Sequence, residues 1–179
     1  MRTRTSRILA VDLRESRLGF AAIEIPNKLL EIGIPTFNSP TGAKSRLLSL
    51  LKAFKPSVLV LDRGSTRGKR NKRRLTTILR MMRSHGQLTS IGVETISAMA
   101  LRSFFAEHGA NNKDDVAGLL SGWFPSLSWK IPPKRKCYES ERWVMAAFDA
   151  VALGVAYLSE NNKDATEYFR RLPVDVQTA

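Results

Sequence analysis

The 179-residue sequence has one cysteine, Cys137, and two histidines, His85 and His108. A single cysteine excludes an internal disulfide and a four-cysteine zinc site, and it fits a reducing cytoplasm. Two histidines leave little material for a histidine-based metal or acid–base site. No apolar run approaches the length of a membrane span, and the first seven residues, MRTRTSR, lack the apolar core of a signal peptide. We therefore expect a cytoplasmic protein that does not enter a membrane.

Acidic residues are also scarce, because 16 Asp and Glu stand against 29 Lys and Arg, which gives a formal net charge of +13. The hydrophobic content of 43% is ordinary for a globular domain with a sizeable core. The positive excess is clustered along the chain, which favours a partner with a phosphate backbone. A basic protein without a special partner, or one that lies on an anionic membrane surface, is the alternative interpretation.

The hydrophobic pattern predicts an α/β domain over residues 1–160, followed by a polar tail over residues 161–179 that is only partly ordered. Apolar runs bounded by turn residues indicate strands, and apolar residues at helical spacing indicate helices. The expected strands are a hairpin within residues 7–25 and the segments 28–37, 57–62 and 89–93. The expected helices are 43–54, 75–85, 96–108, a helix that starts at 113 after an Asn112 cap, and 140–160.

Three aspartates lie inside otherwise apolar elements: Asp12, Asp62 and Asp149. Three strands followed by a right-handed crossover commonly place the first and fourth strands side by side and parallel, which would bring Asp12 near Asp62. A C-terminal helix across that face could add Asp149. Each acid also has a structural alternative. Asp62 could be a turn or cap residue, Asp12 could pair with Arg14 or Arg17, and Asp149 could pair with Arg142 or Lys113.

Carboxylates brought that close together repel one another, and a divalent cation removes the repulsion. Mg²⁺ prefers oxygen ligands and commonly uses a few carboxylates together with water and substrate phosphates. Two such ions about 4 Å apart stabilise both the attacking and the leaving oxygen at a phosphodiester. The three aspartates beside a basic surface therefore predict metal-assisted cleavage of nucleic acid.

Four segments resemble the RNase H-like superfamily, and within it the RuvC-type Holliday junction resolvases and the related YqgF-type proteins. The segment from Asp12 to Ala21 resembles their first hairpin, and the one from Pro56 to Asp62 is similar to the RuvC fourth strand, which usually ends in Glu. Lys113-Asp114-Asp115-Val116 resembles the Lys-x-x-Val that opens a late helix. Asp149-Ala150-Val151-Ala152 resembles the Asp-Ala-x-Ala helix of the family. The resemblance spans about residues 7 to 158.

The resemblance implies a five-stranded mixed sheet, three strands antiparallel and then two parallel, flanked by helices. It implies a metal-dependent endonuclease that cuts branched DNA as a homodimer associated with the nucleoid. Asp12, Asp62 and Asp149 would hold Mg²⁺ or Mn²⁺, with Lys113 completing the catalytic set. Asp115 and Glu141 are further candidate ligands.

Two positions depart from the family pattern. Arg14 stands where the family has a glycine, and Ala146 stands where RuvC resolvases usually carry a further acid. These departures leave open a non-catalytic nucleic-acid-binding module with a degenerate site. A faint YqgF-like motif, Glu94-Thr95-Ile96-Ser97, leaves open a nuclease that processes RNA.

Basic residues follow Asp62 directly and recur in a proline-containing loop near Trp129 and Tyr138. Such side chains could hold phosphates at the rim of the predicted site, largely independently of sequence. A solvated charge run, with Trp129 packed beneath the loop, is the alternative. The predicted nucleic-acid-binding residues are Arg14, Arg63, Arg67, Lys69, Arg70, Lys72, Arg73, Arg74, Lys134, Arg135 and Lys136.

Overall fold

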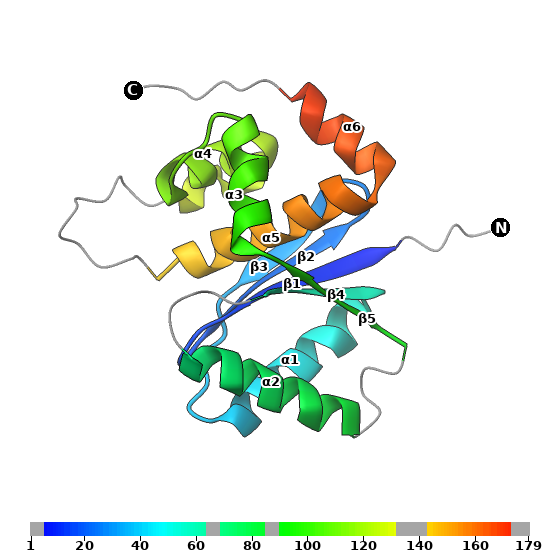
Figure 1. The fold of residues 1–179 in the computed structure, drawn as a ribbon, viewed down its shortest axis with the longest axis vertical. Helices are drawn as coiled ribbons and strands as arrows, with labels where there is room; N and C mark the ends of the chain where they lie inside the picture. Colours follow the sequence, from blue (N-terminus) through cyan, green and yellow to red (C-terminus); the bar gives the residue numbers. More distant parts are fainter. Residues whose placement is uncertain (1–5, 64–68, 85–89, 132–142, 173–179) are drawn as a thin grey trace.

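The computed structural model describes residues 6–63, 69–84, 90–131 and 143–172. One sheet runs through the centre, and helices cover both of its faces (Figure 1). The strands are β1 (Arg7–Leu13), β2 (Leu18–Glu24), β3 (Lys28–Gly33), β4 (Val58–Asp62) and β5 (Gly92–Ile96). The helices are α1 (Pro40–Phe54), α2 (Lys69–Ser84), α3 (Ala98–Glu107), α4 (Lys113–Trp123), the 3₁₀ helix η1 (Pro125–Lys130), α5 (Met145–Asn161) and α6 (Lys163–Arg171).

The sheet has the strand order β3-β2-β1-β4-β5. Strands β1 to β3 pair antiparallel, whereas β4 runs parallel to both β1 and β5. This confirms the predicted mixed sheet of three antiparallel and two parallel strands. None of the described helices combines the length and the apolar character that a membrane span requires.

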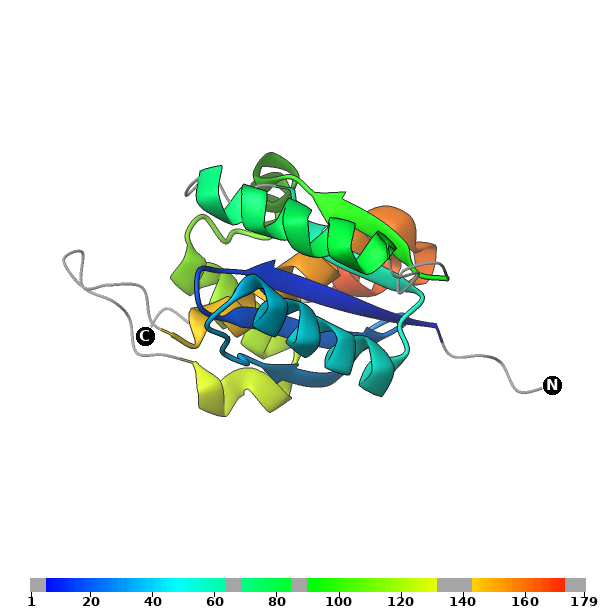
Figure 2. The same ribbon diagram turned by 90° about the horizontal axis from the view of Figure 1, so that it is seen from below.

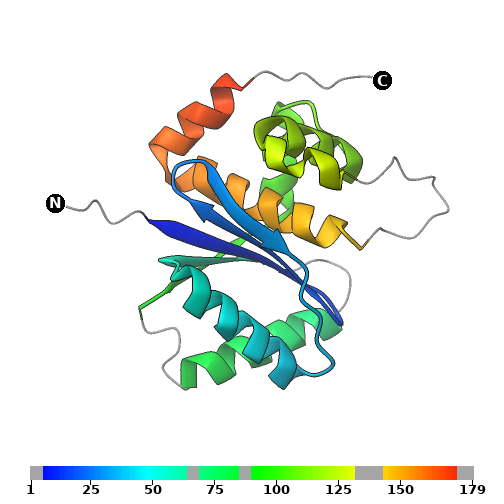
Figure 3. The ribbon, with the colours of Figure 1, turned by 180° about the vertical axis from the view of Figure 1, so that it is seen from behind.

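The two faces of the sheet bury separate apolar clusters, because successive side chains of a strand point to opposite faces. In β1, Ile8 and Ala10 belong to the cluster with α5, and Leu9 and Val11 belong to the cluster with α1 and α2. Helices α1 and α2 lie side by side on their face (Figure 2), whereas α5 crosses the other with α3, α4 and α6 beyond it (Figure 3). The direction in which a strand residue points is therefore fixed by its register.

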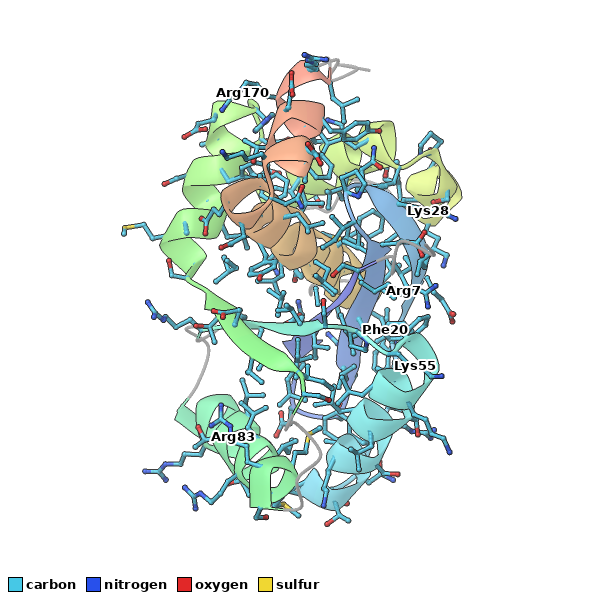
Figure 4. All side chains as sticks on the ribbon, turned by 90° about the vertical axis from the view of Figure 1, so that its right-hand side faces the viewer. Arg7, Phe20, Lys28, Lys55, Arg83 and Arg170 are labelled. Carbon is cyan, nitrogen blue, oxygen red and sulfur yellow. The ribbon has the colours of Figure 1, made fainter. Side chains whose placement is uncertain are left out.

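Two helices begin earlier than the sequence pattern predicts. Helix α1 begins at Pro40, three residues before the predicted start, because the Ser39 side chain accepts a hydrogen bond from the Gly42 amide and caps the helix. Turns and helix caps use the same residue types, and proline suits the first helical position. Helix α2 begins at Lys69, so part of the basic segment is helical. Figure 4 shows Arg83 among the side chains that project outward from α2.

The predicted strand over residues 89–93 ends three residues too early, since β5 spans Gly92–Ile96, and residue 89 lies outside the described residues. As an edge strand with polar Glu94 and Thr95, it gives a weak hydrophobic signal. Helix α5 is described from Met145, and residues 140–142 of the predicted helix lie outside the described residues.

Residues 163–171 of the polar tail, which we expect to be only partly ordered, are helical. They form α6, which begins with a hydrogen bond from the Ala165 amide to the Asn162 side chain. Ala165 and Phe169 are completely buried, one helical turn apart. An apolar stripe of two residues is too narrow to stand out in a polar segment.

Candidate active site

Asp12 and Asp62 project from neighbouring parallel strands towards the same face of the sheet. Val11 pairs with Leu61, so Asp12 and Asp62 are the next residues of their strands. Ala10 and Val60, two residues earlier, both face the cluster that contains α5. By the alternation of a strand, the two aspartates face α5 as well. Asp12 is 5% exposed, and Asp62 is partly buried at the strand end.

Asp149 comes close to Asp12 because α5 lies very close to the sheet. A Cβ atom on Gly19 would stand 1.9 Å from the Ala146 carbonyl oxygen, so only glycine permits this approach. Gly19 is also the residue that pairs with Asp12 across β1 and β2. Asp149 lies three residues after Ala146, which places it over the same end of the sheet. Gly154 provides a second close approach, because a Cβ atom added there would lie 3.3 Å from the Cβ of Ala10.

One cavity of about 780 Å³ brings the predicted catalytic residues together. Asp12, Asp62, Asp149 and Lys113 line it, together with Arg14. Its apolar wall includes Leu101 and Phe105 of α3 and Val116 of α4. The apolar side of the helix over 96–108 is visible in the sequence, but its place beside the acids is not.

Two cations that line this cavity, Arg14 and Lys113, contact Asp12 and Asp149. Arg14 Nε donates to Asp12 Oδ2 at 2.6 Å, and Arg14 Nη2 donates to Asp149 Oδ2. Lys113 Nζ donates to the same Asp149 oxygen at 2.6 Å. The sequence alternatives that paired Asp12 with Arg14 and Asp149 with Lys113 are thus present, in addition to the convergence of the acids.

Burial raises the pKa of Asp12 above the ordinary range of an aspartate, against the lowering effect of Arg14. Burial also raises the pKa of Asp149, where Lys113 acts to lower it and the charge of Asp12 adds to the rise. The carboxyl groups are close enough to disfavour one another's charge. The site therefore needs positive charge to hold its acids ionised.

The oxygen donors of the three aspartates have the chemistry that Mg²⁺ or Mn²⁺ prefers. Within the described part of the chain, however, no group of three acidic, histidine or cysteine side chains is arranged to hold a metal ion as it stands. Arg14 instead connects Asp12 with Asp149. The donor set fits a divalent cation, provided that the arginine gives up its contacts.

Asp115, one of the two further candidate ligands, is not among the residues that line the cavity. Asp115 lies in the first turn of α4, where its Oδ2 accepts hydrogen bonds from the Asn111 amide and, at 2.7 Å, from Asn112 Nδ2. This contact favours a role in the helix cap. Glu141 lies outside the described residues. Ala146, at the position of the missing family acid, is completely buried against Gly19.

The predicted nucleic-acid-binding residues are placed only in part. Arg63 is exposed directly after Asp62, and its amide donates to the Ile96 carbonyl. Arg73 is exposed on α2. The backbones of Lys69, Arg70, Lys72 and Arg74 belong to α2, whereas their side chains, together with Arg67, Lys134, Arg135 and Lys136, lie outside the described residues.

Sequence reasoning missed a pair beside the cavity. Trp143 is 50% exposed and lies under the guanidinium of Arg17, whose central carbon is 4.5 Å from the ring centroid. Arg17 lines the cavity. Gly154 is the other missed residue, and small residues repeated along α5 are the signal that could have indicated a close helix–sheet contact.

The strand order β3-β2-β1-β4-β5, with helices on both faces of the sheet, is that of the RNase H-like fold class. Within that class the chain has the fold of RuvC and other Holliday junction resolvases. The structure of Thermus thermophilus RuvC superposes with a TM-score of 0.61 and 16% identity, over 84% of this chain and 92% of that one. T. thermophilus RuvC in complex with Holliday junction substrate has a TM-score of 0.55 and 12% sequence identity, over 84% of this chain and 91% of that one. The yeast mitochondrial Holliday junction resolvase Ydc2 has a TM-score of 0.59 and 13% sequence identity, over 92% of this chain and 85% of that one.

No family model and no curated protein matches the sequence. The likeness is therefore one of fold.

Proposed function

We propose that this protein is a divalent-metal-dependent endonuclease that cleaves phosphodiester bonds in branched DNA. The observation that carries the proposal is the convergence of Asp12, Asp62 and Asp149, from three separate elements, on one cavity. A buried acid such as Asp12 is unfavourable for folding unless it is compensated. Three acids that line one cavity are difficult to explain by stability alone.

In this proposal Asp12, Asp62 and Asp149 hold Mg²⁺ or Mn²⁺. The bound cation supplies the positive charge that activates a water molecule for attack and stabilises the leaving oxygen. Lys113, which already contacts Asp149 from the start of α4, stabilises negative charge that develops on the phosphate. Arg63 holds a neighbouring phosphate, because it directly follows Asp62 at the end of β4.

Cleavage of a labelled four-way junction in Mg²⁺ or Mn²⁺ tests the proposal, with a linear duplex and an RNA junction of the same sequence as further substrates. Asp12→Asn should slow cleavage by about 10³-fold while junction binding in a gel shift persists, since several kcal/mol of electrostatic stabilisation are removed. Asp164→Asn is the matched control, because it neutralises an exposed carboxylate on α6. A folded wild-type protein that leaves every substrate intact would refute the nuclease. Preference for the RNA junction would favour the RNA-processing alternative.

The contacts of Arg14 favour a second candidate function, a non-catalytic module that binds nucleic acid. Here Arg14 replaces the metal permanently and the fold serves binding alone. Junction binding would then be the same with and without Mg²⁺, and Asp12→Asn would not change it.

A homodimer belongs to the first proposal, because resolution of a junction needs two cuts. The molecular mass of the protein in solution, measured alone and bound to the junction, gives its oligomeric state.

A further inference from the structure

Arg14 connects two acids that come from opposite ends of the chain. It follows β1 in the short turn before β2, where its amide donates to the Arg17 carbonyl at 2.9 Å and so fixes the backbone. From that turn the side chain reaches back to Asp12 and across to Asp149. The Arg14 side chain is only 19% exposed, so its guanidinium lies within the site.

The guanidinium contacts a carboxylate oxygen of each acid, and a bridging cation would bind oxygens of the same two carboxylates. Both contacts are made to Oδ2, and Lys113 shares the one on Asp149. An arginine stays charged at any physiological pH, and its planar fork suits two carboxylates at once. A divalent cation between Asp12 and Asp149 would face this charge at close range and would be repelled.

We propose that Arg14 is an internal counter-cation that competes with the divalent metal for Asp12 and Asp149. The inference rests on the proposed function, since it concerns the metal of that site. Without metal, the positive charge of the guanidinium offsets the repulsion between the two carboxylates. It thereby stabilises the assembled site. Metal enters when the arginine leaves its two carboxylates, so the same contact weakens metal binding.

The proposal predicts two effects of opposite sign from one substitution. Arg14→Ala should bind Mn²⁺ about tenfold or more tightly than the wild type, because the lost charge-assisted hydrogen bonds no longer have to be broken first. The metal-free variant should unfold at a lower temperature than the metal-free wild type, because its acids lose their counter-charge. Excess Mn²⁺ should then raise the unfolding temperature of the variant more than that of the wild type.

Titration calorimetry with Mn²⁺ and thermal unfolding with and without a chelator measure these effects on the whole chain. Arg14→Gln keeps most of the side-chain length, removes the charge, and should behave like Arg14→Ala if the latter folds poorly. Arg83→Ala is the control for net charge, because this exposed arginine is at the far end of α2, on the opposite face of the sheet. Its Mn²⁺ affinity should stay within about twofold of the wild type, since screening weakens distant charges.

Equal or weaker Mn²⁺ binding in both Arg14 variants overturns the inference. If Asp12→Asn abolishes Mn²⁺ binding in that case, the proposed metal site stands and only the role of Arg14 is wrong. If neither the wild type nor the Arg14 variants bind Mn²⁺, the metal-dependent function fails together with the inference.

Discussion

The close contact between Gly19 and α5 can be tested by adding a single methyl group. In Gly19→Ala the new Cβ would lie 1.9 Å from the Ala146 carbonyl oxygen, whereas ordinary contact begins near 3.4 Å. The two backbones would have to separate by about 1.5 Å, the difference between these distances. Because both partners are backbone in a packed core, we expect a loss of about 3 kcal/mol in the free energy of unfolding, at the upper end for overpacking.

Urea unfolding followed by circular dichroism measures this loss. With an m-value of about 2 kcal/mol per molar urea, the midpoint should fall by about 1.5 M. Gly154→Ala should have a smaller effect, because its Cβ meets the end of the Ile23 side chain, which can rotate away. Gly118 lies in the exposed middle of α4, where an added Cβ atom would meet no other part of the protein within 4 Å. Gly118→Ala should therefore raise the free energy of unfolding by about 1 kcal/mol.

The position of Asp149 links this packing to the site. A shift of α5 away from β2 carries Asp149 away from Asp12, and misplacement by about 1 Å can reduce a catalytic rate about 10²-fold. Gly19→Ala should therefore bind Mn²⁺ more weakly than the wild type, whereas Gly118→Ala should not. A urea midpoint of Gly19→Ala equal to that of the wild type would refute the claim that this contact positions α5.

The remaining predictions concern pH and α6. The folded-state pKa of Asp149 is raised, so between the ordinary aspartate range and that higher value the folded protein holds a proton that the unfolded chain has released. The free energy of unfolding, relative to that of Asp149→Asn, should consequently fall as pH rises through this window. Urea titrations at stepped pH measure it, and an increase in this free energy with pH would contradict the raised pKa. Phe169→Ala should destabilise the protein by about 3 to 5 kcal/mol, because Phe169 is completely buried against Trp123 at 5.3 Å between ring centroids. Tyr168→Ala, partly buried beside it, is the control, and equal small effects would show that α6 contributes little to the core.

Features that depend on a few neighbouring residues could be predicted from the sequence. The Asn112 cap is present, with its side chain accepting hydrogen bonds from the Asp114 and Asp115 amides at 2.9 and 3.0 Å. The parallel pairing of β1 with β4 follows from the handedness of crossovers together with buried runs that each end at an aspartate. The shared end of Asp12 and Asp62 is a consequence of that register.

Features that depend on contacts between distant residues could not be predicted. Arg14 and Asp149 are 135 positions apart, and no local pattern distinguishes an arginine that turns back into a site from one that points to solvent. The depth at which α5 lies on the sheet depends on Gly19 and Gly154 meeting particular partners. Their residue type is visible in the sequence, but those partners are not.

The geometry of the site and its charge balance depend on different residues, so the two can be separated by experiment. Gly19 determines how near Asp149 comes to Asp12, and Arg14 determines which cation they share. Gly19→Ala should weaken metal binding and stability together. Arg14→Ala should weaken only the metal-free protein and strengthen metal binding. If both variants changed metal affinity in the same direction, Arg14 would be a structural support for the acids, as Gly19 is, and would not compete with the metal.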